Sequence, residues 1–231
     1  AHVHEIKKIC DRNKLFLIED CAQSHFSSEN DVLAGRLGIA STFSFYPGKN
    51  LGAYGDAGCI MTDNDELATN CRMFANHGAI KKHDHRMEGI NSRLDTLQAA
   101  ILTVKADHIL KWTESRISRA AVYNEALKQV EQVSIPSVRT GTKHTFHLYV
   151  IRAKKRDELK EFLESNGIQT AIHYPTALPN LPAYRYLNHQ PAEFPVATRY
   201  QSEILSLPMY PELTDDQIAY VVAKVKEFFE H

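Results

Sequence analysis

The sequence has 231 residues and a balanced charge, with 27 basic and 28 acidic side chains and a net charge of −1. Such a balance lacks the basic surface that binds nucleic acid or an anionic membrane, and an apolar fraction of 43% is that of an ordinary soluble globular protein. The sequence has no apolar run of 18 residues and no signal peptide, and its four cysteines form no C-x-x-C pair, so a reducing cytoplasm fits best.

The first half of the sequence predicts short strands that alternate with helices, as in an α/β sheet. The segment LFLIED is an apolar run that ends in two carboxylates, which is typical of a parallel strand buried on both faces. In chain order we expect a helix over 3–10, strands over 15–20, 42–46 and 58–62, a helix from Asn64 to Gly78, and a long helix over 92–130 with a break near 108–111. Because the chain opens at Ala1 inside a predicted helix, we expect it to be part of a longer protein.

A change of pattern after residue 135 predicts a second domain. The expected elements are a strand over 145–153, a helix over 157–166, a strand over 168–175, a helix from Pro195 and a last helix from Thr214. Thr214 and Gln217 have the spacing of a capping box. We therefore divide the chain into residues 1–135 and a smaller α+β domain over 136–231.

Four polar side chains follow the predicted strands. Asp20 ends one strand and Gln23 lies three residues further on, while Ser44 and Lys49 lie at the end of the next strand. Ligands gather at the carboxyl ends of parallel strands, so these groups would face one crevice. A pyridoxal 5′-phosphate site needs a lysine, an acid beside the pyridine nitrogen, and donors for the phenolic oxygen and the phosphate. Taken singly, each residue also has an ordinary explanation as a solvated turn residue, a helix start or a strand hydroxyl.

Four stretches resemble the DegT/DnrJ/EryC1/StrS family of sugar-nucleotide aminotransferases, namely LIEDCAQSH, TFSFYPGKNLGAYGDAG, EGINSRLDTLQAAIL and IHYP…LSLPMYPELT. They occur in the family's order and cover essentially the whole sequence. The resemblance implies the α/β fold of PLP-dependent transferases of type I, which is the aspartate-aminotransferase-like fold. It makes residues 1–135 the C-terminal part of the large PLP-binding domain with its long connecting helix, and residues 136–231 the small C-terminal domain.

The resemblance also implies roles for the four polar side chains. Lys49 corresponds to the lysine that binds pyridoxal phosphate covalently, and Asp20 to the partner of the pyridine nitrogen. Gln23 corresponds to a residue near the phenolic oxygen of the cofactor, and Ser44 to a ligand of its phosphate. Lys49 and Asp20 are thus the expected catalytic residues.

Further expected residues would serve a neighbouring subunit. By resemblance, Asn91 reaches the phosphate of the partner's cofactor, and Arg93, His173 and Tyr174 approach the sugar nucleotide across the interface. The implied functional unit is a homodimer with shared active sites.

The implied reaction is transamination of a keto sugar nucleotide, with glutamate as the expected amino donor. The glycine-rich segment after Lys49 is most similar to that of members that aminate C3 of 3-keto sugars. The product would be an amino sugar for surface polysaccharide or glycan synthesis.

Two other interpretations remain open. His77, His83, Asp84 and His85 could indicate a metal site, but they lie on a polar loop beside two lysines, and a solvated loop is the simpler reading, so we expect no metal. A non-catalytic sugar-nucleotide-binding or regulatory protein on the same fold is the alternative function. Loss of the lysine would favour that alternative, and Lys49 is present.

Overall fold

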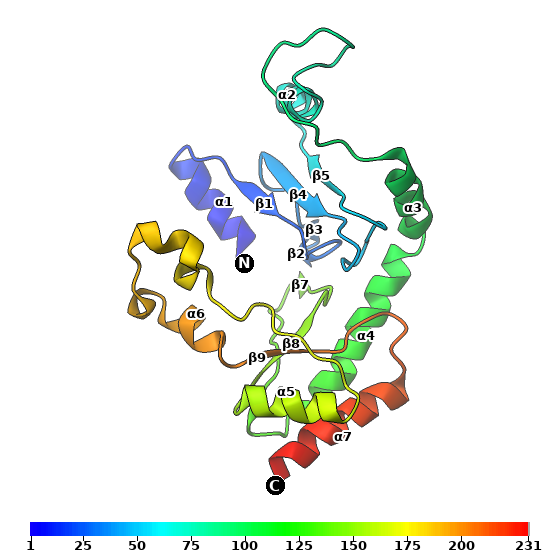
Figure 1. The fold of residues 1–231 in the computed structure, drawn as a ribbon, viewed down its shortest axis with the longest axis vertical. Helices are drawn as coiled ribbons and strands as arrows, with labels where there is room; N and C mark the ends of the chain where they lie inside the picture. The colour runs from blue at the N-terminus through cyan, green and yellow to red at the C-terminus, as the bar shows by residue number, and fades with distance from the viewer. Residues whose placement is uncertain (231) are drawn as a thin grey trace. The chain divides into compact units, whose positions relative to one another are not determined.

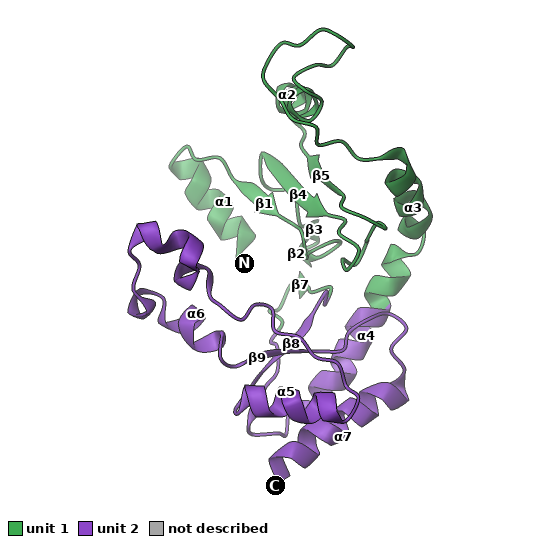
Figure 2. Ribbon diagram, in the orientation of Figure 1, with its two compact units in different colours: residues 1–114, 138–145 green, residues 115–137, 146–231 purple. Residues whose placement is uncertain are grey.

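The computed structural model describes residues 1–230, which belong to two compact units (Figure 2). The first unit contains residues 1–114 and 138–145, and the second contains residues 115–137 and the chain from residue 146 onward. The chain passes from the first unit to the second inside helix α4 (Ile109–Leu127). The expected division into domains of residues 1–135 and 136–231 stays a prediction.

The first unit is built on a three-stranded sheet in the order β1-β4-β5 (Figure 1). Strand β1 (Ile18–Asp20) is parallel to β4 (Ala40–Ser44), and β5 (Gly58–Met61) is antiparallel to β4. All three overlap the predicted strands, but the predicted burial of the first strand on both faces is wrong, because Ile18 is 63% exposed. Among the described residues β1 pairs with β4 alone, so it is an edge strand with little cover.

Helices α1 (Val3–Arg12), α2 (Asp65–Ala75) and α3 (Thr96–Ala106) also belong to this unit. Asn64 caps α2 as predicted, since its Oδ1 accepts a hydrogen bond from the backbone N–H of Leu67 at 2.8 Å. Residues 107 and 108 separate α3 from α4, close to the predicted break in the long helix. None of the helices in residues 1–230 has the length and apolar character needed to cross a membrane.

A small antiparallel sheet joins the segment 138–145 to the rest of the first unit. Its strands are β2 (Ser28–Glu29), β3 (Val32–Leu33) and β7 (Thr142–Lys143), and β2 pairs with both of the others. The sequence analysis predicted none of these strands, because each has only two residues and no apolar alternation.

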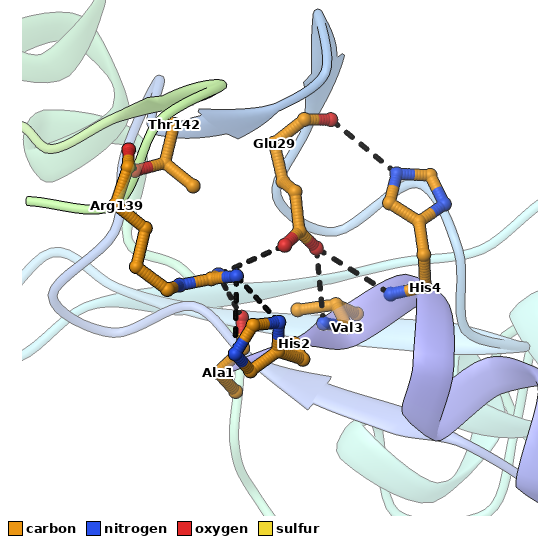
Figure 3. Close-up of polar contacts among 7 residues, drawn as sticks. All are labelled: Ala1, His2, Val3, His4, Glu29, Arg139 and Thr142. Carbon is orange, nitrogen blue, oxygen red and sulfur yellow. Dashed lines mark hydrogen bonds and ion pairs between the residues drawn. The ribbon is translucent and has the colours of Figure 1, made fainter.

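Glu29 ties the ends of this unit together (Figure 3). Its Oε1 forms an ion pair with Nη2 of Arg139 at 2.8 Å, and its Oε2 accepts hydrogen bonds from the backbone N–H groups of Val3 and His4 at 3.0 and 3.4 Å. Burial raises the pKa of Glu29, but the hydrogen bonds from Arg139 and from the two amides outweigh burial, so its pKa lies below the ordinary value of 4.5. The carboxylate therefore stabilises the start of α1, where unpaired N–H groups favour an anion.

The second unit contains an antiparallel sheet in the order β6-β8-β9. Its strands are β6 (Val133–Ser134), β8 (Tyr149–Ala153) and β9 (Ile204–Leu207), and helices α5 (Arg156–Ser165) and α7 (Asp215–Glu230) complete the core. The apolar spacing in the last helix predicts a buried face of Ile218, Val221, Val222, Val225 and Phe229, and the first four are at most 7% exposed in α7 while Phe229 is partly buried. Burying each such side chain contributes about 1.5–3 kcal/mol, so this helix is a main source of the unit's stability.

In the second unit one prediction based on neighbouring residues is confirmed, and one that depends on a distant strand partner is wrong. The capping box is present: the N–H of Thr214 donates to Oε1 of Gln217 at 2.9 Å, and the N–H of Gln217 donates to Oγ1 of Thr214 at 3.2 Å. The predicted strand over 168–175 is wrong, because this stretch meets β9 in a single bridge between Ala171 and Ser206. The chain then continues through η1 (Leu178–Asn180), η2 (Pro182–Leu187), η3 (Pro191–Glu193) and α6 (Pro195–Tyr200).

Candidate active site

The two carboxylates at the end of β1 have different surroundings. Glu19 is 9% exposed, and its side chain accepts hydrogen bonds from three backbone N–H groups, those of Gly35, Leu37 and Gly38, at 2.7–2.9 Å. Asp20 is exposed, and its Oδ1 accepts one hydrogen bond, from the N–H of Ala22 at 3.0 Å. Both carboxylate oxygens of Glu19 therefore accept hydrogen bonds from the loop before β4, while Asp20 keeps one oxygen without a partner among the described residues.

The polar side chains predicted after the strands lie along one edge of the sheet. Strands β1 and β4 are parallel, with Asp20 opposite Thr42, so their carboxyl ends meet at the same edge. The backbone N–H of Cys21 donates to the carbonyl of Thr42 at 2.8 Å, which continues the pairing of the two strands, and Gln23 follows two residues later with an exposed side chain. Ser44 is the last residue of β4, and its Oγ accepts a hydrogen bond from the N–H of Tyr46 at 3.3 Å.

Lys49 is held in a tight turn that follows this edge. Its N–H donates to the carbonyl of Tyr46 at 2.8 Å, and the N–H of Ala53 donates to the carbonyl of Phe45 at 2.7 Å. A Cβ added at Gly52 would lie 2.3 Å from the carbonyl oxygen of Pro47, so only glycine fits there. The half-buried Lys49 thus sits on a closed loop of fixed shape, unlike a lysine on an ordinary solvated turn.

His25 lies beside Lys49 and was not singled out from the sequence. It is 4% exposed, and its ring centroid lies 5.4 Å from that of Phe43 and 5.9 Å from that of Phe45. Neither ring nitrogen has a hydrogen-bond partner among the described residues. Burial, followed by the positive charge of Lys49, lowers the pKa of His25 below its usual value and outweighs a backbone contact with Ser44 that is too poor in geometry to count as a hydrogen bond, so the imidazole is neutral at pH 7. In the sequence, His25 is marked only by its position two residues after Gln23. No periodic pattern indicates that its side chain is buried beside the site.

Asn91 and Arg93 form a second polar group within the first unit. The backbones of Asn91 and Asn76 form an isolated antiparallel β-bridge. The guanidinium of Arg93 donates hydrogen bonds to Oδ1 of Asn91 at 3.2 Å and to Oδ1 of Asn76 at 3.4 Å. Arg93 and Ser44 line the same cavity, which has a volume of about 1020 Å³. The exposed guanidinium of Arg93 is therefore oriented by neutral amide oxygens and pairs with no carboxylate among the described residues.

The histidine-rich loop is held by its own polar contacts. Nδ1 of His85 lies 2.8 Å from the carbonyl oxygen of His77, and Arg86 forms an ion pair with Asp84 at 2.8 Å. Within residues 1–230, no three His, Cys, Asp or Glu side chains are grouped so that they could hold a metal ion.

His173 and Tyr174 belong to the second unit. Nδ1 of His173 lies 2.8 Å from Oγ of Ser206 on β9, which fixes the ring. Tyr174 is 63% exposed and lines a cavity of about 770 Å³, together with Pro175, Leu178 and Tyr200. The structure thus places Asp20, Gln23, Ser44 and Lys49 in segments that follow one edge of the sheet. Asn91 and Arg93 form a second group, whose cavity also includes Ser44, and His173 and Tyr174 belong to the other unit.

Comparison with solved structures identifies the fold. The chain matches a crystal structure described as "S. venezuelae DesV in complex with ketimine intermediate" with a TM-score of 0.95 and 35% identity, covering 100% of this chain and 62% of that one. The predicted α/β fold of PLP-dependent transferases of type I is thereby confirmed. The model of the DegT/DnrJ/EryC1/StrS aminotransferase family matches residues 1–226, and the chain belongs to that family, as its motifs predicted.

Curated relatives carry two kinds of name. The chain is 46% identical, over 100% of its length, to the "Pleiotropic regulatory protein" of Geobacillus stearothermophilus. It is 36% identical, again over 100% of its length, to the "dTDP-3-amino-3,4,6-trideoxy-alpha-D-glucose transaminase" of Streptomyces venezuelae. The chain spans 63% of the length of the first of these relatives and 61% of the second.

Proposed function

We propose that the protein is a pyridoxal-phosphate-dependent aminotransferase that converts a keto sugar nucleotide into an amino sugar nucleotide. The observation that carries the proposal is the position of Lys49, in a turn of fixed shape at the sheet edge that also bears Asp20 and Ser44. Family membership and the name of the Streptomyces relative support the same reaction.

The chemistry of these side chains fits pyridoxal phosphate. The edge offers an amine, a carboxylate with an unpartnered oxygen, an amide and a hydroxyl, and beside them lies a buried imidazole whose nitrogens have no partner among the described residues. Lys49 would bind the cofactor covalently, Asp20 would meet its pyridine nitrogen, Gln23 its phenolic oxygen and Ser44 its phosphate. When bound, the cofactor supplies an electron sink for the carbon that loses a proton.

The protein's own residues would then hold and move protons. The carboxylate of Asp20 keeps a proton on the pyridine nitrogen, because an adjacent negative charge favours the protonated ring. The amine of Lys49 would take the proton from Cα of the amino donor and pass it to C4′ of the cofactor, and in the second half-reaction it would carry a proton from C4′ to the former keto carbon of the sugar. This step needs an unprotonated amine, and the neutral imidazole of His25 can lie beside Lys49 without adding a second positive charge.

We infer that the substrate is a 3-keto sugar linked to a nucleotide and that the amino donor is glutamate. The printed name of the Streptomyces relative, a 3-amino sugar transaminase, supports amination at C3. The cysteines are all free, which suits our assignment to the reducing cytoplasm. The product would enter surface polysaccharide or glycan synthesis.

A direct experiment separates this proposal from the regulatory alternative, which the name of the Geobacillus relative favours. The full-length protein, purified with pyridoxal phosphate, should show a visible absorption band that borohydride removes. It should also turn over at least one member of a panel of 3-keto and 4-keto nucleotide sugars with glutamate as donor. A protein without the band contradicts the proposal, and a band with no turnover on any substrate supports a binding or regulatory role.

We also propose that each active site is shared between two subunits of a homodimer, with Asn91, Arg93, His173 and Tyr174 serving the partner's site. Lys49→Ala and Arg93→Ala subunits should each be inactive alone. After mixing, a heterodimer would contain one site with both residues intact, so random exchange of equal amounts should restore about a quarter of wild-type activity. Activity and subunit exchange would be followed in the same samples, the latter by native mass spectrometry. Exchange without any return of activity would mean that Lys49 and Arg93 act within one chain.

A further inference from the structure

We propose that Gln98 and Lys105 of helix α3 are positioning residues for Lys49, because they anchor the turn on which Lys49 is mounted. The inference rests on the proposed function, since it concerns the geometry of the covalent site. Gln98 and Lys105 are seven residues apart, so they lie on the same face of α3, two helical turns from each other.

Both side chains contact the backbone of the turn. Oε1 of Gln98 accepts a hydrogen bond from the N–H of Tyr54 at 2.7 Å. Nζ of Lys105 donates to the carbonyl of Gly52 at 2.6 Å and lies 4.6 Å from the centroid of the Tyr54 ring. Two backbone polar groups, two residues apart, are thus held by one helix, which fixes both the position and the direction of the chain between them.

The anchored segment is joined to Lys49 through the backbone hydrogen bonds of the turn. The hydrogen bond from Ala53 to Phe45 closes the loop that contains Lys49, and Ala53 lies between the two anchored residues, Gly52 and Tyr54. The loop is tightly closed, because a Cβ at Gly52 would lie only 2.3 Å from the carbonyl oxygen of Pro47. A shift of residues 52–54 away from α3 would therefore also displace Lys49 relative to Asp20 and Ser44.

Polar contacts anchor the turn on the side where its aromatic residues stay exposed. Tyr54 is 74% exposed and Tyr46 is 56% exposed, whereas Ala53 is fully buried and the buried Asn50 donates a hydrogen bond to the carbonyl of Thr145 at 3.4 Å. The ammonium group of Lys105 forms no ion pair with a carboxylate among the described residues, and its polar contacts are with the turn alone. In the positioning role its charge strengthens the hydrogen bond to the Gly52 carbonyl and the contact with the ring.

The role predicts a specific loss in Gln98→Ala and in Lys105→Met. Misplacement of a reacting group by about 1 Å can cost on the order of 10²-fold, so we expect kcat to fall about 10- to 100-fold while KM for the amino donor changes less than about twofold. The pH midpoint of the borohydride-sensitive band should shift by about half a unit or more, because it reports the surroundings of the Lys49 nitrogen. Gln98→Glu and Lys105→Arg keep an acceptor and a donor, and should recover most of the rate.

The test uses the full-length protein loaded with pyridoxal phosphate, with Thr103→Ala as the control. Thr103 lies on the same helix, and its hydroxyl bonds to the carbonyl of Ala99 within α3. Circular dichroism would establish folding, and hydrogen exchange at the amides of residues 49–54 would report the anchoring independently of the cofactor. Faster exchange in both anchor variants, but not in Thr103→Ala, is expected.

The outcomes separate this inference from the proposed function. A wild-type protein without the band would overturn the proposed function and with it this role. A wild-type protein with the band would overturn this inference alone if folded Gln98→Ala and Lys105→Met keep the same midpoint, the same kcat within about twofold and the same amide exchange.

Discussion

Replacing Lys49 by alanine should abolish both the borohydride-sensitive absorption band and transamination, while the fold is largely kept. In the proposed reaction the side chain would supply the covalent bond to the cofactor and the base for proton transfer, and proton transfer by a positioned side chain alone contributes about 10²–10⁴-fold. The fold should survive because the backbone bonds of the turn do not involve the side chain, and no ion pair of Lys49 is lost among the described residues.

Two comparisons test this prediction, and one outcome would contradict it. Lys82→Ala, in the exposed loop before α3, removes a lysine from the same unit and should keep the band and the rate. Added methylamine should restore part of the proton transfer in Lys49→Ala, because it supplies the missing base without the missing tether. Near-normal turnover in Lys49→Ala, measured with the keto sugar nucleotide found for the wild type, would rule out the assignment.

The predictions that succeeded depend on residues close together in the chain. The cap at Asn64, the box formed by Thr214 and Gln217, and the break between α3 and α4 follow from side chains within a few positions of one another. The side chains of the capping residues can reach only nearby backbone groups, so the sequence pattern and the structure carry the same information.

The predictions that failed depend on what lies next to a segment in space. The apolar run at β1 predicted burial on both faces, but burial needs a covering layer, and the sequence of the strand does not specify one. The stretch over 168–175 has a strand-like composition, yet a strand also needs a continuous partner, and here the partner is met at the single pair of Ala171 and Ser206.

The common edge that bears the polar residues was predictable from the sequence, and the contacts that support the turn were not. Asp20, Ser44 and Lys49 could be related to one edge because parallel strands end together. The supports join distant segments: Gln98 contacts a residue 44 positions away and Lys105 one 53 positions away. No spacing rule applies at such separations, so these contacts, like the burial of His25 between two phenylalanines, could be found only in the structure.

Glu19 and Asp20 show how one strand can place two adjacent carboxylates in different surroundings. Successive side chains on β1 point to opposite faces, so Glu19 faces the loop amides and Asp20 faces away from them. Two adjacent carboxylates look equivalent in the sequence, and hydrogen bonding separates them. The one with an unpartnered oxygen is the one available to a ligand.

Asp20→Asn should therefore leave the absorption band in place and lower kcat on the order of 10³-fold, which corresponds to about 4 kcal/mol of barrier. Asparagine keeps the acceptor for the N–H of Ala22, so the local fold should be preserved, but a neutral amide no longer holds a proton on the pyridine nitrogen. Single-turnover kinetics with glutamate would measure the proton-transfer step directly, and Asp63→Asn, an exposed aspartate after β5, is the matched control. A loss smaller than about tenfold would show that Asp20 does not face the pyridine nitrogen, whereas loss of the band itself would assign Asp20 to cofactor binding and not to the electron sink.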